Sequence, residues 1–386
     1  MNTLEFNLQS KDNNFNLIRA LAALAVIFSH SFILAEGSVT KGDPISSFFG
    51  TVISGLAVDI FFLLSGILVT KSLIDRNSIK VFTISRVFRI FPALLASILF
   101  CILIVGPLST NLGLVEYLFH PETKSFLINN MFLFDRIIQF SLPGVFQDLP
   151  YPVAVNGSLW SLPWEVLMYS SILGLFIVSK KHILKLLVAA CIIAYAGWGA
   201  RHIFGIEVIS PVSLKLITMF YTGVAFYLLR HKIRMTWLTT AIVVAGYLIV
   251  KDMSIAKLIW PATLCYTTLA FAYLLKGAIL KYNQLGDYSY GLYIYSFPIQ
   301  QLLVMYFAPS AWVLFFLSTF LTTVCAMLSW RYIEKPCMRL KNTFLPSSKT
   351  VKESEPINLV DQLKAENKEL RNEVEALKME LELNKQ

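Results

Sequence analysis

The sequence predicts an all-α polytopic membrane protein with about ten transmembrane helices and a cytoplasmic coiled coil at its C-terminus. Of the 386 residues, 56% are hydrophobic and only 15% are charged, which is more apolar than the core of a soluble domain requires. The apolar residues form runs of about 20, long enough to cross about 30 Å of hydrocarbon. Residues 357–386 differ, because apolar residues recur there in a heptad pattern among charged ones.

Ten apolar runs account for the predicted transmembrane helices. They cover residues 16–35, 50–70, 88–106, 157–179, 186–200, 211–229, 237–250, 258–275, 288–306 and 311–330. The first run is long and is followed by further spans, so we expect an uncleaved helix and not a signal peptide. Four cysteines fall in these spans and Cys337 lies beyond them, which predicts neither a disulfide framework nor a metal site.

Basic residues in the connecting loops predict the orientation of the helices. With a cytoplasmic N-terminus, the inner loops hold 13 Lys or Arg residues in 36 positions, and the outer loops hold 6 in 82. The inner loops are 71–89, 180–185, 230–234 and 276–281. An even number of spans then places both termini in the cytoplasm. The net charge of +9 fits this bias and gives no indication of nucleic-acid binding.

The chain divides into a transmembrane domain at 1–341, a linker at 342–356 and a coiled-coil tail at 357–386. Ser, Pro and charged residues are typical of a linker. In the tail, heptad position a holds Val360, Asn367, Val374 and Leu381, and position d holds Leu363, Leu370 and Leu377. A single Asn among Val residues at position a favours two parallel strands, which predicts a homodimer. The alternative is a solitary, solvated charged helix.

The segment 107–156 is the one large outer loop of the predicted topology. It contains amphipathic stretches followed by a turn-rich stretch, SLPGVFQDLPYPVAVNGS. Two interpretations are equally compatible with this pattern: a cap over the outer face, or a re-entrant structural element without a ligand.

Two ionisable residues in the first span share one helix face. Arg19 and His30 are eleven positions apart, which at 100° per residue is about 20° from three full turns and about 16 Å along the axis. Charged groups at this depth usually face a cavity or a partner. Taken singly, Arg19 is also compatible with an arginine that reaches the headgroups, and His30 with a hydrogen-bonded buried histidine.

Further ionisable residues lie in other spans. Asp59 falls near the middle of the second span, and Glu165 about eight residues into the fourth, close to a helix-loosening Pro163. Arg86 and Arg89 lie three apart where the third span begins, and their guanidinium groups suit phosphate oxygens. A simple positive-inside anchor explains these two arginines equally well.

These residues belong to six motifs whose order resembles the acyltransferase-3 family of bacterial membrane O-acyltransferases, from about Asn14 to Lys341. The motifs are Arg19 and His30 with ten residues between them, VDIFFLLSG (58–66), RVFR (86–89), SLWSLPWE (158–165), YSYGLYIYSFP (288–298) and IEKP (333–336). The resemblance implies transfer of an acyl group, usually acetyl from cytoplasmic acetyl-CoA, to a hydroxyl of a cell-surface glycan such as lipopolysaccharide O-antigen or exopolysaccharide. It further implies a location in the bacterial inner membrane and no cofactor besides the acetyl-CoA co-substrate.

The resemblance also implies roles for individual residues. Arg19, His30, Arg86, Arg89 and Glu165 match family positions considered functional. The remaining motif residues with an acceptor-side or structural role are Ser65, Trp160, Ser161, Tyr290 and Ser296. At Ser296 many members carry a histidine, so the role of that histidine does not carry over. Many relatives also carry an added hydrolase-like domain, which this chain lacks, so we expect the membrane domain to carry out both halves of the reaction.

The expected mechanism joins these residues. Arg19, Arg86 and Arg89 bind the phosphates of acetyl-CoA, and His30 acts as general base or accepts the acetyl group, oriented by Glu165 or Asp59. The main alternative is a proton-coupled glycan or lipid transporter, because buried His, Asp and Glu also form proton relays. A membrane anchor that gathers partners through its tail leaves the buried charges unexplained.

Overall fold

The computed structural model describes residues 3–10, 12–38, 42–133, 138–207 and 209–344. This part of the chain is helical, and its only β-type pairings are two isolated bridges. The predicted coiled-coil tail and most of the predicted linker lie outside the described residues. The coiled coil therefore stays a prediction.

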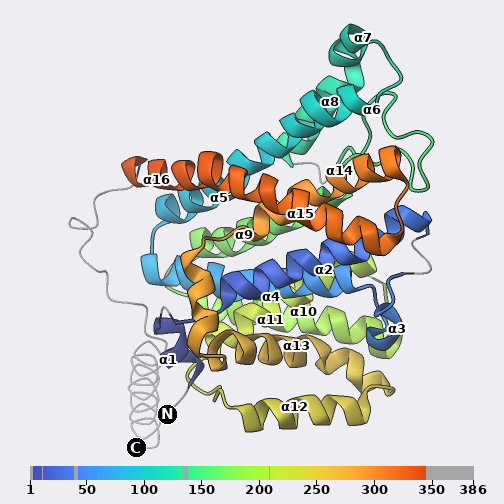
Figure 1. Cartoon of the computed structure of the whole chain (residues 1–386). Coiled ribbons are helices and arrows are strands. Elements are labelled where there is room, and N and C mark those ends of the chain that lie inside the picture. Colours follow the sequence, from blue (N-terminus) through green and yellow to red (C-terminus); the bar gives the residue numbers. More distant parts are fainter. Residues whose placement is uncertain (1–2, 11, 39–41, 134–137, 208, 345–386) are drawn as a thin grey trace, which may run out of the picture.

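Sixteen α-helices and four short π or 3₁₀ turns make up the described chain (Figure 1). The α-helices are α1 (Leu4–Gln9), α2 (Phe15–Glu36), α3 (Ser46–Phe49), α4 (Ile53–Arg76), α5 (Ile79–Phe100), α6 (Gly106–Ser109), α7 (Leu114–Phe119), α8 (Pro121–Phe132), α9 (Leu162–Val178), α10 (Ile183–Phe204), α11 (Pro211–Leu228), α12 (Trp237–Val250), α13 (Ser254–Leu274), α14 (Ser289–Phe307), α15 (Ala311–Ser329) and α16 (Lys335–Phe344). The short turns are η1 (Cys101–Val105), η2 (Gly157–Ser161), η3 (Gly277–Gln284) and η4 (Trp330–Glu334).

Eight of these helical segments are long and apolar enough to cross a membrane, which confirms a polytopic membrane protein. They are Phe15–Glu36, Ile53–Arg76, Ile79–Ser109, Gly157–Val178, Ile183–Phe204, Pro211–Leu228, Ser254–Leu274 and Ala311–Lys341. The two other predicted spans correspond to α12, which has only 14 residues, and α14, whose buried Gln300 and Gln301 lower its hydropathy. Fourteen of the 19 residues of α14 are buried, so this helix lies inside the bundle and not at its lipid-facing surface.

The helix α5 begins earlier than its apolar run. Ser78 caps it, because the Ser78 hydroxyl accepts a hydrogen bond from the Val81 amide at 3.4 Å. The prediction that Arg86 and Arg89 lie where the helix begins was therefore wrong. Both lie in its second and third turns, so their side chains lie beside other helices and not at the end of α5.

The position of Pro163 also differs from the prediction. It lies in the first turn of α9, where a missing amide costs nothing, and a 3₁₀ turn precedes it. The helix therefore begins at Leu162 instead of being loosened there. Glu165 lies in this first turn, where the positive end of the helix dipole stabilises a carboxylate.

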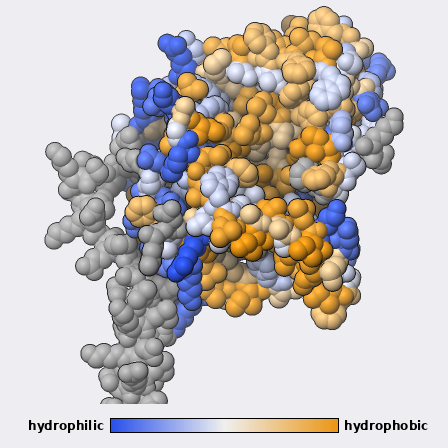
Figure 2. Space-filling view, turned by 60° about the horizontal axis from the view of Figure 1, so that its bottom comes forward, coloured by the Kyte–Doolittle hydropathy of each residue, from blue (hydrophilic) through white to orange (hydrophobic). Residues whose placement is uncertain are grey.

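The helices lie side by side in one bundle (Figure 1). Along it, α12 contacts α13, α11 contacts both α10 and α4, and α2 contacts α4, α14 and α15. Figure 2 shows a broad apolar belt across the helices, with hydrophilic residues gathered on two opposite sides of it. This distribution fits a bundle that is embedded in a bilayer.

The segments predicted as inner loops meet at one end of the bundle. The Leu4 amide donates to the Ile233 carbonyl at 2.8 Å, and the Asn14 amide donates to the Ala272 carbonyl at 2.8 Å. Arg230 forms an ion pair with Glu5 at 3.7 Å. The N-terminal segment therefore lies against the basic loop 230–234. This contact agrees with the prediction that both lie on the same side of the membrane.

The long segment between α5 and α9 is structured at its two ends. The short helices α7 and α8 form a corner that projects from the bundle (Figure 1). The stretch before α9 instead enters the bundle, because Gln301 donates hydrogen bonds at 2.9 Å to the carbonyls of Tyr151 and Ala154. The two interpretations of this segment, a cap or a re-entrant element, stay predictions.

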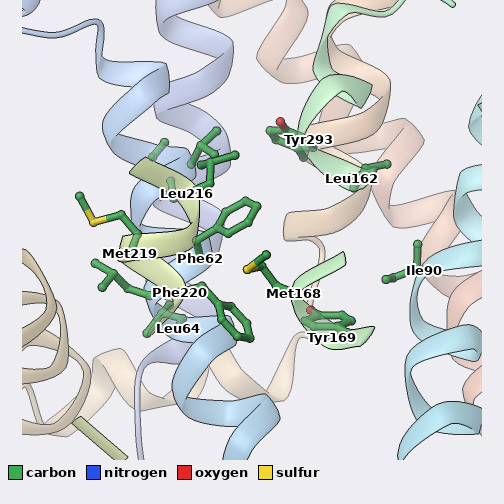
Figure 3. Close-up of a cluster of buried hydrophobic side chains, with 14 of the residues drawn as sticks. Phe62, Leu64, Ile90, Leu162, Met168, Tyr169, Leu216, Met219, Phe220 and Tyr293 are labelled. Atoms are coloured by element: carbon green, nitrogen blue, oxygen red, sulfur yellow. The ribbon is translucent and has the colours of Figure 1, made fainter. Parts of the chain in front are cut away.

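The tightest helix contact is the crossing of α4 and α11. A Cβ on Gly66 would lie 2.1 Å from the Phe220 carbonyl oxygen, and one on Gly223 would lie 2.2 Å from the Leu63 carbonyl oxygen. Only glycine permits this approach. Figure 3 shows the apolar side chains that the crossing gathers, with Phe62 of α4 near Phe220 of α11. The glycine of VDIFFLLSG is therefore a packing residue.

Because no Cβ fits at the crossing, Gly66→Val should force α4 and α11 apart. We expect a loss of at least about 1–3 kcal/mol, the usual cost of overpacking. The thermal transition of the detergent-purified protein, followed by tryptophan fluorescence, should fall by several degrees. Gly174→Val is the matched control, because no atom lies within 4 Å of a Cβ at this helical glycine. An equal loss in both variants would contradict the close crossing.

Candidate functional site

A cavity of about 360 Å³ opens between α2, α4, α5, α9, α14 and α16. Seven of the eleven predicted site residues line it. These are Arg19, Ser65, Arg86, Arg89, Ser161, Glu165 and Tyr290. Five basic and two acidic side chains face this cavity, which gives it an excess of positive charge. His30, Asp59, Trp160 and Ser296 do not line it.

Arg89 is the most highly connected charge of the cavity. Its Nη2 lies 2.5 Å from Oδ2 of Asp287, and its Nη1 lies 3.7 Å from Oε2 of Glu334. Its guanidinium carbon also lies 5.9 Å from the ring centre of Tyr290. Two carboxylates therefore hold this arginine of α5. Asp287 lies just before α14, and Glu334 lies at the end of η4, just before α16.

Asp287 joins Arg89 to Arg19. Its Oδ2 is also 3.5 Å from Nη1 of Arg19, and its Oδ1 accepts hydrogen bonds from the amide and hydroxyl of Ser289. Burial on its own raises the pKa of Asp287, but the ion pairs with Arg89 and Arg19 outweigh it and hold the pKa below its usual value. Asp287 is therefore ionised at neutral pH.

Arg86 has a different environment from Arg89, although both face the cavity. Its guanidinium carbon lies 5.5 Å from the ring centre of Tyr169 and 5.8 Å from that of Phe82. Within the described part of the chain it forms no ion pair with a carboxylate, and its buried Nε has no hydrogen-bond partner. The charge of Arg86 is thus available to an anion in the cavity.

Glu165 presents a carboxylate to the same cavity. The hydroxyl of Tyr169, one turn later on α9, donates a hydrogen bond to it. The Ser65 hydroxyl lies 3.4 Å from the Tyr169 hydroxyl, so α4 is linked to this pair. The arrangement fixes Glu165 and leaves part of its carboxylate facing the cavity.

One end of the cavity is closed by aromatic rings. The Ser161 hydroxyl lies 2.8 Å from the hydroxyl of Tyr293, and the Tyr293 ring lies edge-on to Phe61 at 5.9 Å between ring centres. Tyr293 is labelled beside Leu162 in Figure 3. Tyr290 lies nearly one turn from Tyr293, and its hydroxyl donates to the Ile90 carbonyl at 3.1 Å.

His30 lies beyond this closed end. Its ring is edge-on to Phe297, with 5.3 Å between ring centres, and its buried Nδ1 has no hydrogen-bond partner. Phe297 follows Tyr293 by four residues on α14, or about 6 Å along the helix axis. His30 is partly exposed, although its Nδ1 is buried. About one turn of α14 separates its ring contact, Phe297, from Tyr293, which lines the cavity.

Asp59 pairs with a residue that the sequence analysis did not name. Its Oδ2 lies 2.9 Å from Nζ of Lys215 on α11, and only 1% of its side chain is exposed. The described contacts of Asp59 and Glu165 include none with His30. The expectation that one of these carboxylates orients the imidazole therefore has no contact to support it.

The other two predicted motif residues outside the cavity contribute to packing. Trp160 is half-buried against the core, and Ser296 is fully buried, with its hydroxyl donating to the Tyr293 carbonyl at 3.2 Å. No group of three or more His, Cys, Asp or Glu residues suited to a metal ion occurs among the described residues.

Sequence reasoning missed three residues that shape the cavity: Asp287, Glu334 and Tyr169. Glu334 lies in the IEKP motif, and Asp287 directly precedes the YSYG stretch, so their positions beside motifs were a usable signal. Tyr169 follows Glu165 by four residues, which is the spacing of neighbours on a helix face. Buried arginines need carboxylate partners, and a search for such partners beside the motifs would have identified Asp287 and Glu334.

Comparisons with known proteins show the family of this chain. A family model described as an acyltransferase domain matches residues 12–331. Nodulation protein 10 of Rhizobium leguminosarum bv. viciae is 26% identical over 359 residues, covering 86% of this chain and 95% of the relative. An O-acetyl transferase of Shigella phage Sf6 is 29% identical over 346 residues, covering 84% and 96%. No solved structure matches the chain significantly. Because the matched region spans most of the chain, the protein belongs to the acyltransferase-3 family and is an acyltransferase.

Proposed function

We propose that this acyltransferase moves an acetyl group from cytoplasmic acetyl-CoA to a hydroxyl of a cell-surface glycan, such as lipopolysaccharide O-antigen or exopolysaccharide. The observation that carries the proposal is a positively charged cavity that ends one helical turn from a partly exposed histidine. The similarity to a phage O-acetyl transferase supports acetyl and a hydroxyl acceptor. The family assignment favours transfer over the transporter alternative.

The donor enters this cavity with its nucleotide end at the arginines. Acetyl-CoA carries several phosphate charges on a long thin arm, and guanidinium groups bind phosphate oxygens through paired hydrogen bonds. The arm then runs along α9 past Glu165 toward Ser161 and Tyr293. Its thioester reaches the aromatic end of the cavity, on the side where His30 lies.

His30 acts on the acceptor hydroxyl in this proposal. Its Nδ1 has no hydrogen-bond partner among the described residues, so a neutral imidazole can accept the proton of an acceptor hydroxyl there. The acceptor oxygen attacks the thioester carbon, His30 takes the hydroxyl proton, and the carbon–sulfur bond breaks. The imidazolium returns its proton to the thiolate of CoA. In the covalent alternative, the His30 imidazole attacks the thioester carbon and the thiolate of CoA leaves. The acceptor oxygen then attacks the acetyl group on His30, the carbon–nitrogen bond breaks, and the hydroxyl proton passes to the thiolate.

Glu165 supports the positive charge that His30 gains during transfer. It lines the cavity, whereas the charge of Asp59 is already neutralised by Lys215. The aromatic layer of Phe61, Tyr293 and Phe297 must open by about one helical turn, or about 5 Å, for the thioester to meet the imidazole.

The proposal places the protein in the bacterial inner membrane with ten crossings and both termini in the cytoplasm. The arginine-lined end of the cavity then faces acetyl-CoA, and His30 lies in the outer half, where glycans are exposed. The heptad tail joins two copies of the chain as a parallel homodimer.

The proposed activity is testable with purified protein and with cells. Protein in liposomes should transfer label from acetyl-CoA to a surface glycan, because the donor and acceptor sites lie within one chain. Deletion of the chain should remove acetyl groups from surface glycans, as measured by mass spectrometry, and the wild-type chain should restore them. Movement of the glycan across the liposome without acetylation would contradict the proposal.

His30→Ala should reduce acetyl transfer by about a hundredfold or more, the usual contribution of a positioned acid–base group. The amount of protein in the membrane should stay unchanged, because His30 contacts only an aromatic ring through its described side-chain interactions. His182→Ala, an exposed histidine distant from the cavity, serves as the control. A residual rate above about a tenth of the wild type would exclude His30 as the base.

The predicted tail dimer is tested on a peptide of residues 355–386. Two strands should form, because Leu at position d and a single Asn at position a favour a parallel pair. Analytical ultracentrifugation measures the strand number directly. A monomer at tens of micromolar would contradict the dimer and leave a solitary charged helix.

A further inference from the structure

Three basic side chains at the cavity have no described acidic partner: Arg76, Arg86 and Lys341. We propose that they form a phosphate-binding site for the nucleotide end of the donor, while Arg89 and Arg19 hold the cavity wall. This inference rests on the proposed function, because it takes a coenzyme A thioester as the donor. It adds Arg76 and Lys341 to the phosphate-binding residues, and it gives Arg89 and Arg19 a structural role instead.

The three cations come from three different helices and converge on one space. Arg76 is the last residue of α4, Arg86 lies on α5, and Lys341 lies on α16. All three line the cavity, and both arginines are close enough to act electrostatically on Lys341. Bringing like charges together costs free energy unless an anion offsets it. The described residues provide no ion pair to any of the three.

The nearby carboxylates are engaged elsewhere. Asp75 precedes Arg76 in the chain, but it pairs with Lys71 and accepts a hydrogen bond from Tyr227 at 3.4 Å. Of the two acids that line the cavity, Asp287 binds Arg89 and Arg19, and Glu165 accepts the hydrogen bond from Tyr169. The charge of the three cations is therefore not matched from within the described chain.

Unpartnered hydrogen-bond donors accompany the three charges. Among the described residues, the buried Ser85 hydroxyl and Arg86 Nε have no hydrogen-bond partner, and Ser85 lines the cavity. Ser72 also lines it and precedes Arg76 by one helical turn on α4. Cations mixed with serine hydroxyls are the donors that phosphate oxygens accept. A phosphomonoester or a diphosphate fits this set.

Arg89 and Arg19 cannot serve the same phosphate without losing their partners. The Asp287 carboxylate already occupies one face of each guanidinium, and Glu334 lies beside the other side of Arg89. The two arginines of RVFR thus have different roles. Arg86 faces the ligand, and Arg89 positions α5 against α14 and α16. Lys341 lies beyond residue 331, where the family match ends.

The test compares the dissociation constants of coenzyme A and pantetheine for the full-length, detergent-purified chain by calorimetry. Lys341→Gln and Arg76→Gln should each weaken coenzyme A binding by about tenfold, the usual value of one charge-assisted contact. Pantetheine carries no phosphate, so its affinity should not change. Lys335→Gln, an exposed lysine of the same helix outside the cavity, should leave both constants unchanged.

Several outcomes would overturn the assignment. Equal weakening of coenzyme A and pantetheine would indicate a general disturbance of α16. Unchanged coenzyme A binding, with loss of co-purified phosphatidylglycerol, would make the cluster a lipid-headgroup site. If the wild type bound no coenzyme A, the proposed function itself would fail. If the wild type bound it and both variants bound it equally well, only the phosphate site would fail.

Discussion

The ion pairs around Asp287 are the interaction on which the cavity depends. Two arginines inside a membrane bundle are costly unless carboxylates offset them, and one buried aspartate reaches both Arg19 and Arg89. The contacts connect α2, α5 and the start of α14, and Glu334 extends them to η4 next to α16. A wall built from paired charges can be polar without filling with counter-ions, so the space beside it stays open to a ligand.

The sequence predicted where the helices form and several of the residues that line the cavity, for reasons that differ between the two. Apolar runs of about 20 residues determine where helices form, and each of the ten predicted runs corresponds to a helix. The positions of helix ends depend on other features, namely the Ser78 cap and the position of Pro163, which a hydropathy profile does not detect. The number of crossings stays a prediction beyond the eight apolar segments, because α14 is polar and buried among other helices.

The site residues that were found lie in motifs, and those that were missed are the partners of these motif residues. A pattern such as RVFR shows that two arginines share a helix face, but not which of them meets a carboxylate. That distinction arises from the packing of α5 against the α14 and α16 region, which brings in Asp287 and Glu334 from 198 and 245 positions later in the chain. Asp59 illustrates the same limit, because Lys215 lies on a helix far along the chain.

The aromatic rings between the cavity and His30 bear on the permeability of the membrane. In the proposed function a nucleotide donor binds from one side of the membrane and a glycan from the other, and an open path between them would leak protons and metabolites. Phe61, Tyr293 and Phe297 fill the intervening layer with ring carbons, through which ions and phosphates pass poorly. A two-carbon acyl unit is the smallest part of the reactants. If only that unit crosses the layer, the cell retains its donor pool and its proton gradient while its surface is modified.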